Sequence, residues 1–93
     1  MNLETNPRFE FRDGSFVEVS VTRVPESEIH EIGIKYSFQF VNPDGTPVLR
    51  YDNAHGVHER HEGDGDGIPI EYEGDVEAHL ERFFDEVEEL RRR

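Results

Sequence analysis

The segment from residue 33 to residue 40 reads Gly33-Ile34-Lys35-Tyr36-Ser37-Phe38-Gln39-Phe40. Apolar and polar side chains alternate in it without a break, and a period of two residues is typical of a β-strand. Ile34, Tyr36, Phe38 and Phe40 are therefore expected to face a core, with Lys35, Ser37 and Gln39 on the opposite face. This pattern predicts an antiparallel sheet that is buried on one side only.

Turn signals on both sides of this segment extend the sheet. Pro43-Asp44-Gly45 is expected to turn the chain into a strand over residues 46–53. Val17, Val19 and Val21 alternate with polar residues in a strand over residues 16–24, and Asp13-Gly14 predicts a hairpin to a short strand around Phe9 and Phe11. A fifth short strand is expected where Ile68, Ile70 and Tyr72 alternate with polar residues, and Pro69 places it at an edge.

The C-terminal residues predict one helix. Asp75 is a suitable cap, and an apolar stripe recurs at helical spacing through Val76, Leu80, Phe83, Phe84, Val87 and Leu90. His79 is expected on the helix surface. The Phe83-Phe84 pair either fills the core of a monomer or widens the stripe for a homodimer. The predicted fold is α+β, a meandering antiparallel sheet of about five strands with one C-terminal amphipathic helix packed on it, in a single domain over residues 1–93 with residues 1–7 flexible.

The charge of the chain is unusual for a core this small. Its 93 residues include 22 acidic and 10 basic side chains, for a formal net charge of -12, and Lys35 is the only lysine. Concentrated salt screens such repulsion, so the composition favours a halophile; an acidic protein that mimics nucleic acid or seeks a basic partner is the alternative. The chain has no cysteine, no apolar run that could span a membrane and no leader, which predicts a cytoplasmic protein.

The groups able to do chemistry are concentrated between Tyr51 and His61. His55, His58 and His61 recur every third residue there, beside Asp52, Asn53 and Arg60. Read as a metal site, the three histidines would bind a divalent ion such as zinc, although their spacing is not a strong zinc signature. Solvated histidines in a polar loop are the structural alternative. Tyr51 has a possible core role, and Asp52-Asn53 a possible turn role.

An acid/base interpretation uses the same residues differently. Cleavage of RNA without a metal needs a base, an acid and a ligand for the phosphate charge. Two histidines, His58 and His61, suit the first two roles, and Arg60 suits the third. Asp52 would orient a histidine, and Tyr51 would donate a proton or stack on a base.

Several motifs also resemble a known family. Asp13-Gly14 followed by Val17-Glu18-Val19, the Lys35-Tyr36 strand, the Tyr51-Asp52-Asn53-Ala54 box, the His58-x-x-His61 pair and the phenylalanine-containing terminal helix are similar to the TumE family of toxins. The likeness runs from about Phe11 to the terminal helix. It implies a toxin that acts on RNA and is neutralised by a helix-turn-helix antitoxin. The matching positions are Tyr51, Asp52, Asn53, His58 and His61, with Arg60 at a position that is often basic.

The leading hypothesis from the sequence is a halophilic, TumE-like toxin with metal-independent ribonuclease chemistry. Its catalytic residues would be His58, His61, Asp52 and Tyr51, and Arg60 and Asn53 would bind the substrate. One alternative is a binding module without chemistry that docks the helix-turn-helix protein. The other is a divalent-metal protein that uses His55, His58 and His61.

Overall fold

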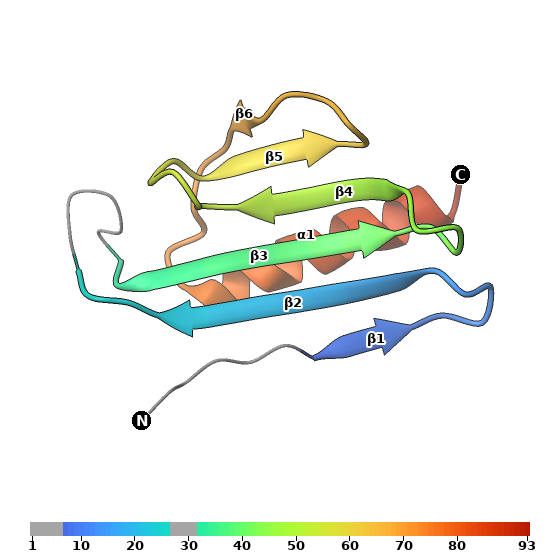
Figure 1. The fold of residues 1–93 in the computed structure, drawn as a ribbon, viewed down its shortest axis with the longest axis horizontal. Helices are drawn as coiled ribbons and strands as arrows, with labels where there is room; N and C mark the ends of the chain where they lie inside the picture. Colours follow the sequence, from blue (N-terminus) through green and yellow to red (C-terminus); the bar gives the residue numbers. More distant parts are fainter. Residues whose placement is uncertain (1–6, 27–31) are drawn as a thin grey trace.

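A computed structural model describes residues 7–26 and 32–93. It contains one antiparallel sheet with a single helix, α1 (Val76–Arg91), behind it (Figure 1). The expected flexible segment 1–7, apart from Pro7, lies outside the described residues, as does His30. The strands are β1 (Arg8–Glu10), β2 (Phe16–Arg23), β3 (Ile34–Val41), β4 (Pro47–Asp52), β5 (Glu59–Glu62) and β6 (Ile68–Pro69).

The strands pair in the order in which they occur along the chain. Each is antiparallel to the next, in the spatial order β1-β2-β3-β4-β5-β6, which confirms the α+β meander with its C-terminal helix. Gly14, in the first hairpin turn, has φ +92°, a conformation that glycine adopts without strain. The six strands exceed the expected five because the histidine-rich segment forms one of its own.

A polar loop, the structural alternative given for the histidines, describes only part of that segment. Residues 59–62 form β5 and pair with β4, Tyr51 opposite Arg60 and Asp52 opposite Glu59. Without β5, the backbone groups of β4 would lie unpaired at an edge. The strand expected around Ile68 is shorter than predicted and ends at Pro69, although Ile70 and Tyr72 still pack against the core.

The core lies between the sheet and α1. The predicted alternation of β3 is confirmed, since Tyr36, Phe38 and Phe40 are all buried. They pack with Val17 and Val19 of β2, Leu49 and Tyr51 of β4, and Phe83 and Val87 of α1. One face of the sheet is therefore covered by the helix (Figure 1). The opposite face carries most of the polar side chains of the longer strands β2, β3 and β4.

The helix begins as its sequence predicts but buries one residue more. Asp75 caps it by accepting a hydrogen bond of 2.8 Å from Ala78 N. His79, expected on the surface, is instead 0% exposed. The prediction was wrong because His79 lies four residues before Phe83, on the same face, and Tyr36 of the sheet supplies its hydrogen-bond partner.

The phenylalanine pair belongs to the core of this chain. Phe83 is 0% exposed and packs edge-on against Tyr51 and Phe38. Phe84 is partly buried and packs edge-on against Phe9 of β1. Both rings thus find partners within one molecule. Among residues 7–26 and 32–93, no helix is long and apolar enough to cross a membrane.

Candidate functional site

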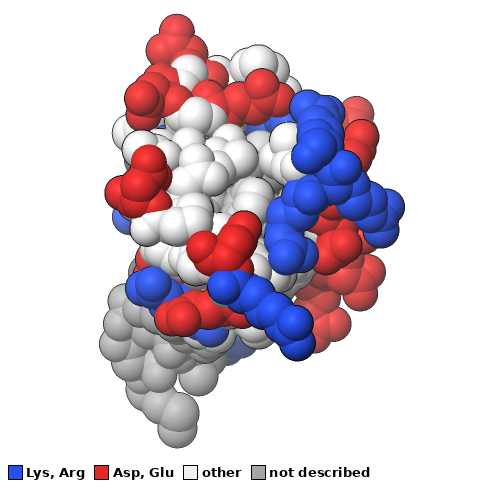
Figure 2. Space-filling model, turned by 90° about the vertical axis from the view of Figure 1, so that its right-hand side faces the viewer, with Lys and Arg blue, Asp and Glu red and all other residues white. Residues whose placement is uncertain are grey.

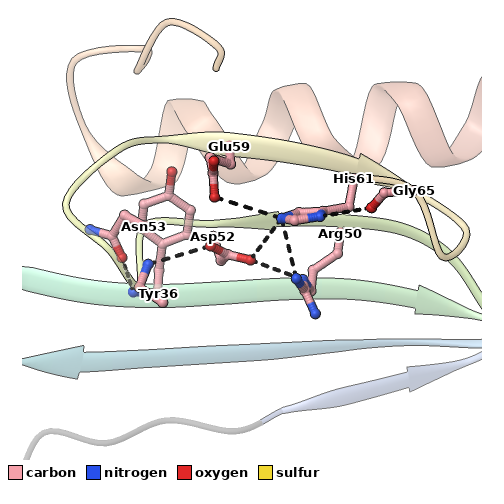
Figure 3. Close-up of polar contacts among 8 residues, drawn as sticks. Tyr36, Arg50, Asp52, Asn53, Glu59, His61 and Gly65 are labelled. Carbon is pink, nitrogen blue, oxygen red and sulfur yellow. Dashed lines mark hydrogen bonds and ion pairs between the residues drawn. The ribbon is translucent and has the colours of Figure 1, made fainter. Parts of the chain in front are cut away.

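The face of the sheet opposite α1 is hollowed. A pocket of about 680 Å³ lies over β2, β3, β4 and β5, and most of the residues that line it are of polar types. Its acidic and basic lining residues are Lys35 from β3, Arg50 and Asp52 from β4, and Glu59 from β5, and two histidines, His55 and His61, also line it. Figure 3 shows the groups from β4 and β5 in front of the sheet, with the helix behind it. We call Arg50, Asp52, Glu59 and His61 the open-face cluster.

Strand register brings the open-face cluster together. Arg50 lies opposite His61 and Asp52 opposite Glu59, because β4 and β5 are antiparallel. Directly opposed side chains on one face of a sheet are close enough to interact. Arg50 and Asp52 are two residues apart, as are Glu59 and His61, so all four side chains point to the same face.

One nitrogen of His61 is at the centre of the cluster. His61 Nε2 lies 3.2 Å from Arg50 Nη2, 3.5 Å from Asp52 Oδ2 and 3.8 Å from Glu59 Oε1 (Figure 3). Asp52 is only 7% exposed, and its Oδ2 lies 2.9 Å from Arg50 Nε. An imidazole is thus held beside a guanidinium and two carboxylates, at the edge of a pocket large enough for a ligand.

His58 lies on the other face of the sheet. Its Nδ1 is 2.7 Å from the Tyr36 hydroxyl, and its ring stacks on Tyr72 with 4.6 Å between the centroids. The same hydroxyl lies 2.9 Å from His79 Nε2. The arrangement ties the loop before β5 to β3 and α1. His58 and His61 are therefore not brought together, and a reaction that needs both rings on one phosphate does not fit this geometry.

Burial keeps the groups around His58 uncharged at neutral pH. It lowers the pKa of His58 and raises the pKa of Tyr36. Burial, followed by the charges of His58 and Arg82, lowers the pKa of His79 to about 4. Neutral histidines that hydrogen-bond a buried tyrosine contribute to the packing of the core.

Tyr51 and Arg60 also face the helix. The Tyr51 hydroxyl donates a 2.5 Å hydrogen bond to Glu86 Oε1, and the Arg60 guanidinium binds Glu86 Oε2 and Glu62. Burial and the bond to Glu86 raise the pKa of Tyr51 to about 12. Burial alone would raise the pKa of Glu86, but the bonds from Arg60 and Tyr51 outweigh it and hold that pKa below its ordinary value. The hydrogen-bonding groups of Tyr51, Arg60 and Glu86 are thus already paired with one another.

Asn53 joins two strands. It is 2% exposed, its Oδ1 accepts a hydrogen bond from Tyr36 N, and its Nδ2 donates one to the carbonyl of Ile34. Both contacts fasten the end of β4 to the beginning of β3. A buried amide whose donor and acceptor are both used in this way has a structural role.

The histidines expected to bind a metal are divided between the two faces. His55 and His61 line the pocket, whereas His58 lies against Tyr36. A different set, Asp52, Glu59 and His61, places three possible ligand atoms within 4.8 Å of one another. Nitrogen and carboxylate oxygen ligands suit zinc, but the Arg50 guanidinium 3.2 Å from His61 Nε2 is a positive charge beside that position.

Sequence reasoning missed two members of the open-face cluster. Arg50 and Glu59 were not among the predicted site residues, although each is two residues from one of them, Asp52 or His61. That spacing was the available signal, since it places both members of each pair on one face of a strand. For Glu59 and His61, this spacing predicts a shared face only if residues 59–62 are recognised as a strand.

Comparison with known proteins gives one clear result. The family described as Toxin TumE matches residues 3–91 of the 93-residue chain. No curated protein and no solved structure matches the chain significantly. The family match includes every strand, the open-face cluster and α1. The chain therefore belongs to the TumE family of toxins, which are components of toxin–antitoxin modules.

Proposed function

We propose that this toxin is a ribonuclease that works without a metal and that His61 is its central acid/base group. The observation that supports this proposal is the contact of His61 Nε2 with Arg50, Asp52 and Glu59 at the edge of the pocket. Imidazole titrates near neutrality, and a neighbouring guanidinium is a good ligand for phosphate. Asp52 and His61 keep the catalytic roles expected from the sequence, and Arg50 replaces Arg60 as the phosphate ligand.

The proposed reaction is an internal transesterification of RNA. The Glu59 carboxylate takes the proton of the ribose 2′-hydroxyl, and the 2′-oxygen attacks the adjacent phosphorus. The bond from phosphorus to the 5′-oxygen breaks, and protonated His61 donates the Nε2 proton to the departing oxygen. The products are a 2′,3′-cyclic phosphate and a 5′-hydroxyl. Arg50 and Lys35 balance the charge that develops on the phosphate.

Local charge makes this substrate compatible with an acidic protein. The pocket is lined by two basic residues, Lys35 and Arg50, and by two acidic ones, Asp52 and Glu59. The pocket is therefore close to neutral with neutral His61 and positive with protonated His61, although the whole chain carries -12. A phosphodiester entering the pocket meets no excess of negative charge.

The overall charge supports adaptation to high salt. In Figure 2 the acidic side chains are scattered over the visible surface and lie beside a band of basic ones. Scattered acids of this kind are compatible with screening by a salty cytoplasm, where the Debye length falls to about 3 Å at 1 M salt. A protein that imitates nucleic acid would be expected to gather its acids into a continuous strip. We therefore propose a cytoplasmic toxin of a halophile.

The alternative to an enzyme is a module that only binds its partner. Membership of a toxin family supports an antitoxin as that partner, and we propose a helix-turn-helix protein in that role. A homodimer that pairs through the edge strand β1 is a further proposal, which the exposure of Phe9 in this strand supports. Light scattering of the purified chain distinguishes a monomer from a dimer.

A second candidate function is binding of a divalent ion by Asp52, Glu59 and His61, whose ligand atoms lie within 4.8 Å of one another. Its test is RNA cleavage after exhaustive chelation and after addition of zinc, magnesium or manganese. Metal-independent chemistry predicts equal rates in all of these samples. A rate that returns only with one metal would favour the divalent-ion site.

Growth of a salt-adapted host tests the proposed toxin function. The wild type, His61→Ala and His58→Ala are expressed to equal levels without the antitoxin. Arrest by the wild type and His58→Ala, with growth of His61→Ala, is the expected result, because His61 lines the pocket and His58 does not. Equal arrest by all three would remove His61 from the mechanism. Equal growth of all three would favour the partner-binding module.

A further inference from the structure

We infer that the glycine-rich loop between β5 and β6, residues 63–67, holds His61 in one tautomer and one orientation, with Gly67 as a positioning residue. Two independent features of the loop support this inference: a carbonyl group that contacts the ring and a backbone packed against two side chains of the open-face cluster. Its catalytic consequence rests on the proposed ribonuclease function, but its structural part can be measured without any substrate.

The first feature is the carbonyl of Gly65. It lies 3.2 Å from His61 Nδ1 (Figure 3). A carbonyl oxygen only accepts hydrogen bonds, so His61 Nδ1 carries the hydrogen. On the other side of the ring, Arg50 Nη2 only donates, so Nε2 presents its lone pair. Both contacts select the Nδ1–H tautomer, whereas a solvated histidine favours Nε2–H.

This tautomer directs proton transfer into the pocket. With Nδ1–H fixed on Gly65, a proton can be gained and lost only at Nε2, which faces Arg50, Asp52 and Glu59. In the opposite tautomer the free lone pair would face the loop. The proposed acid step requires the proton on Nε2 to be the one transferred.

The loop is tightly closed around this carbonyl. Gly65 N donates to the Glu62 carbonyl at 2.8 Å, and Gly63 N donates to the Val48 carbonyl at 3.0 Å. A β-carbon on Gly65 would come within 2.9 Å of the Glu62 carbonyl oxygen. The position of the carbonyl therefore depends on a turn that leaves no room for a side chain at this residue.

The second feature is the backbone of Gly67. A β-carbon there would lie 2.8 Å from His61 Cε1 and 2.8 Å from Glu59 Cδ. Gly67 is not among the glycines with positive φ, so its backbone conformation is open to other residues. The need for glycine at this position comes from the two side chains that pack on it. A methyl group would push His61 or Glu59 out of place.

The tautomer is measured first on the wild-type protein. Nitrogen-15 chemical shifts of the histidine rings are recorded at about pH 8, above the ordinary histidine pKa of about 6.5. We expect His61 as Nδ1–H. His58 and His79 provide the internal contrast, because both should be Nε2–H: Glu73 N donates to His79 Nδ1, His79 Nε2–H to the Tyr36 oxygen, and Tyr36 O–H to His58 Nδ1. A His61 ring that is Nε2–H or a mixture overturns the inference.

The variant Gly67→Ala tests the packing, with Asp66→Ala as its control. Asp66 is exposed in the same loop, and among the described residues it forms no hydrogen bond or ion pair with His61. Gly67→Ala should change the His61 ring shifts and lower RNA cleavage by about 100-fold, the scale of a small misplacement of a catalytic group. Asp66→Ala should leave both unchanged. Unchanged His61 shifts and cleavage in a folded Gly67→Ala protein would contradict the role of Gly67.

The measurements separate this inference from the proposed function. A His61 ring in the Nδ1–H form in a protein that cleaves no RNA supports the loop's role and contradicts the ribonuclease proposal. Cleavage by a protein whose His61 is a tautomer mixture contradicts the loop's role and leaves the ribonuclease proposal standing. If Gly67→Ala does not fold, His61→Asn and His61→Gln replace it. The side-chain amide of His61→Asn keeps an N–H donor near the position of Nδ1, so hydrogen exchange of the Gly65 amide should stay slow. In His61→Gln that slow exchange should be lost.

Discussion

Arg50 and His61 are cross-strand partners on the open face of the sheet, and Arg50 Nη2 lies 3.2 Å from His61 Nε2. The guanidinium donates a hydrogen bond to the nitrogen that the proposed mechanism uses, and Asp52 contacts both groups. A phosphate that entered the pocket would offer Arg50 a better acceptor than a neutral imidazole. Binding of substrate would thereby release His61 Nε2 for proton transfer.

Arg50 should be essential for RNA cleavage. Arg50→Gln removes the proposed phosphate ligand and should lower the rate by about 100- to 1000-fold, as loss of a transition-state donor does in other enzymes. The control is Arg23→Gln, because Arg23 is exposed at the end of β2. Circular dichroism checks that both variants fold. Equal loss of activity in the two would point to a general charge effect rather than to a ligand role.

His79 should make the protein less stable in acid. Because burial and neighbouring charges lower its pKa from 6.5 to about 4, the unfolded chain takes up a proton that the folded protein does not. Above pH 6.5, the pKa difference of His79 between the folded and the unfolded protein makes its full contribution to the free energy of unfolding. It falls as the pH drops from 6.5 to about 4, by up to about 3 kcal/mol.

Urea unfolding of the wild type and His79→Leu at pH 7 and pH 5 measures this effect. Carboxylates contribute a pH dependence of their own, so the informative quantity is the difference between the two proteins. The wild type should lose more stability than His79→Leu on acidification. Equal losses of unfolding free energy in both proteins would show that the pKa of His79 is not lowered by folding.

Glu86 should stabilise the contact between the helix and the sheet. Its side chain and that of Arg60 are 22% and 21% exposed, so Glu86→Ala leaves a largely buried guanidinium with only the exposed Glu62 as its carboxylate partner. We expect a loss of about 2 kcal/mol in the free energy of unfolding. Glu89→Ala, at an exposed position of the same helix, should change it little. Similar losses in the two variants would indicate an effect on the helix alone.

Salt should stabilise the protein. Increasing potassium chloride from about 0.1 M to 2 M screens repulsion among the acidic side chains and should raise the melting temperature. A variant in which Glu71, Glu77, Glu81 and Asp85 are replaced by their amides should respond less, because these exposed acids contribute to the repulsion. A melting temperature that does not change with salt would contradict adaptation to a salty cytoplasm.

Much of the fold could be predicted because its signals are local. The alternation of residues 34–40, the Asp13-Gly14 turn and the Asp75 cap each depend on neighbours a few residues away. The length of β6 and the existence of β5 depend instead on pairing with distant strands. Residues 59–62 have no apolar alternation, so their partner β4 makes them a strand.

The site was harder to predict for the same reason. Regular spacing suggested that His58 and His61 act together, but three residues along an extended chain place them on opposite faces of the sheet. Tyr51, His58 and Arg60 lie toward the helix, and Asp52 and His61 lie toward the pocket. Helical spacing places His79 on the face of Phe83, but the hydrogen-bond partner that a buried histidine needs, Tyr36, is 43 residues away.

Cleavage of a defined single-stranded RNA by the purified, chelator-treated protein tests the central claim most directly. The wild type, His58→Ala and His61→Ala are compared at equal concentration, and the product ends are identified. Products with 2′,3′-cyclic phosphate and 5′-hydroxyl ends should form with the wild type and His58→Ala, and His61→Ala should form almost none. Full cleavage by His61→Ala, or its loss in His58→Ala alone, would contradict a reaction on the open face of the sheet.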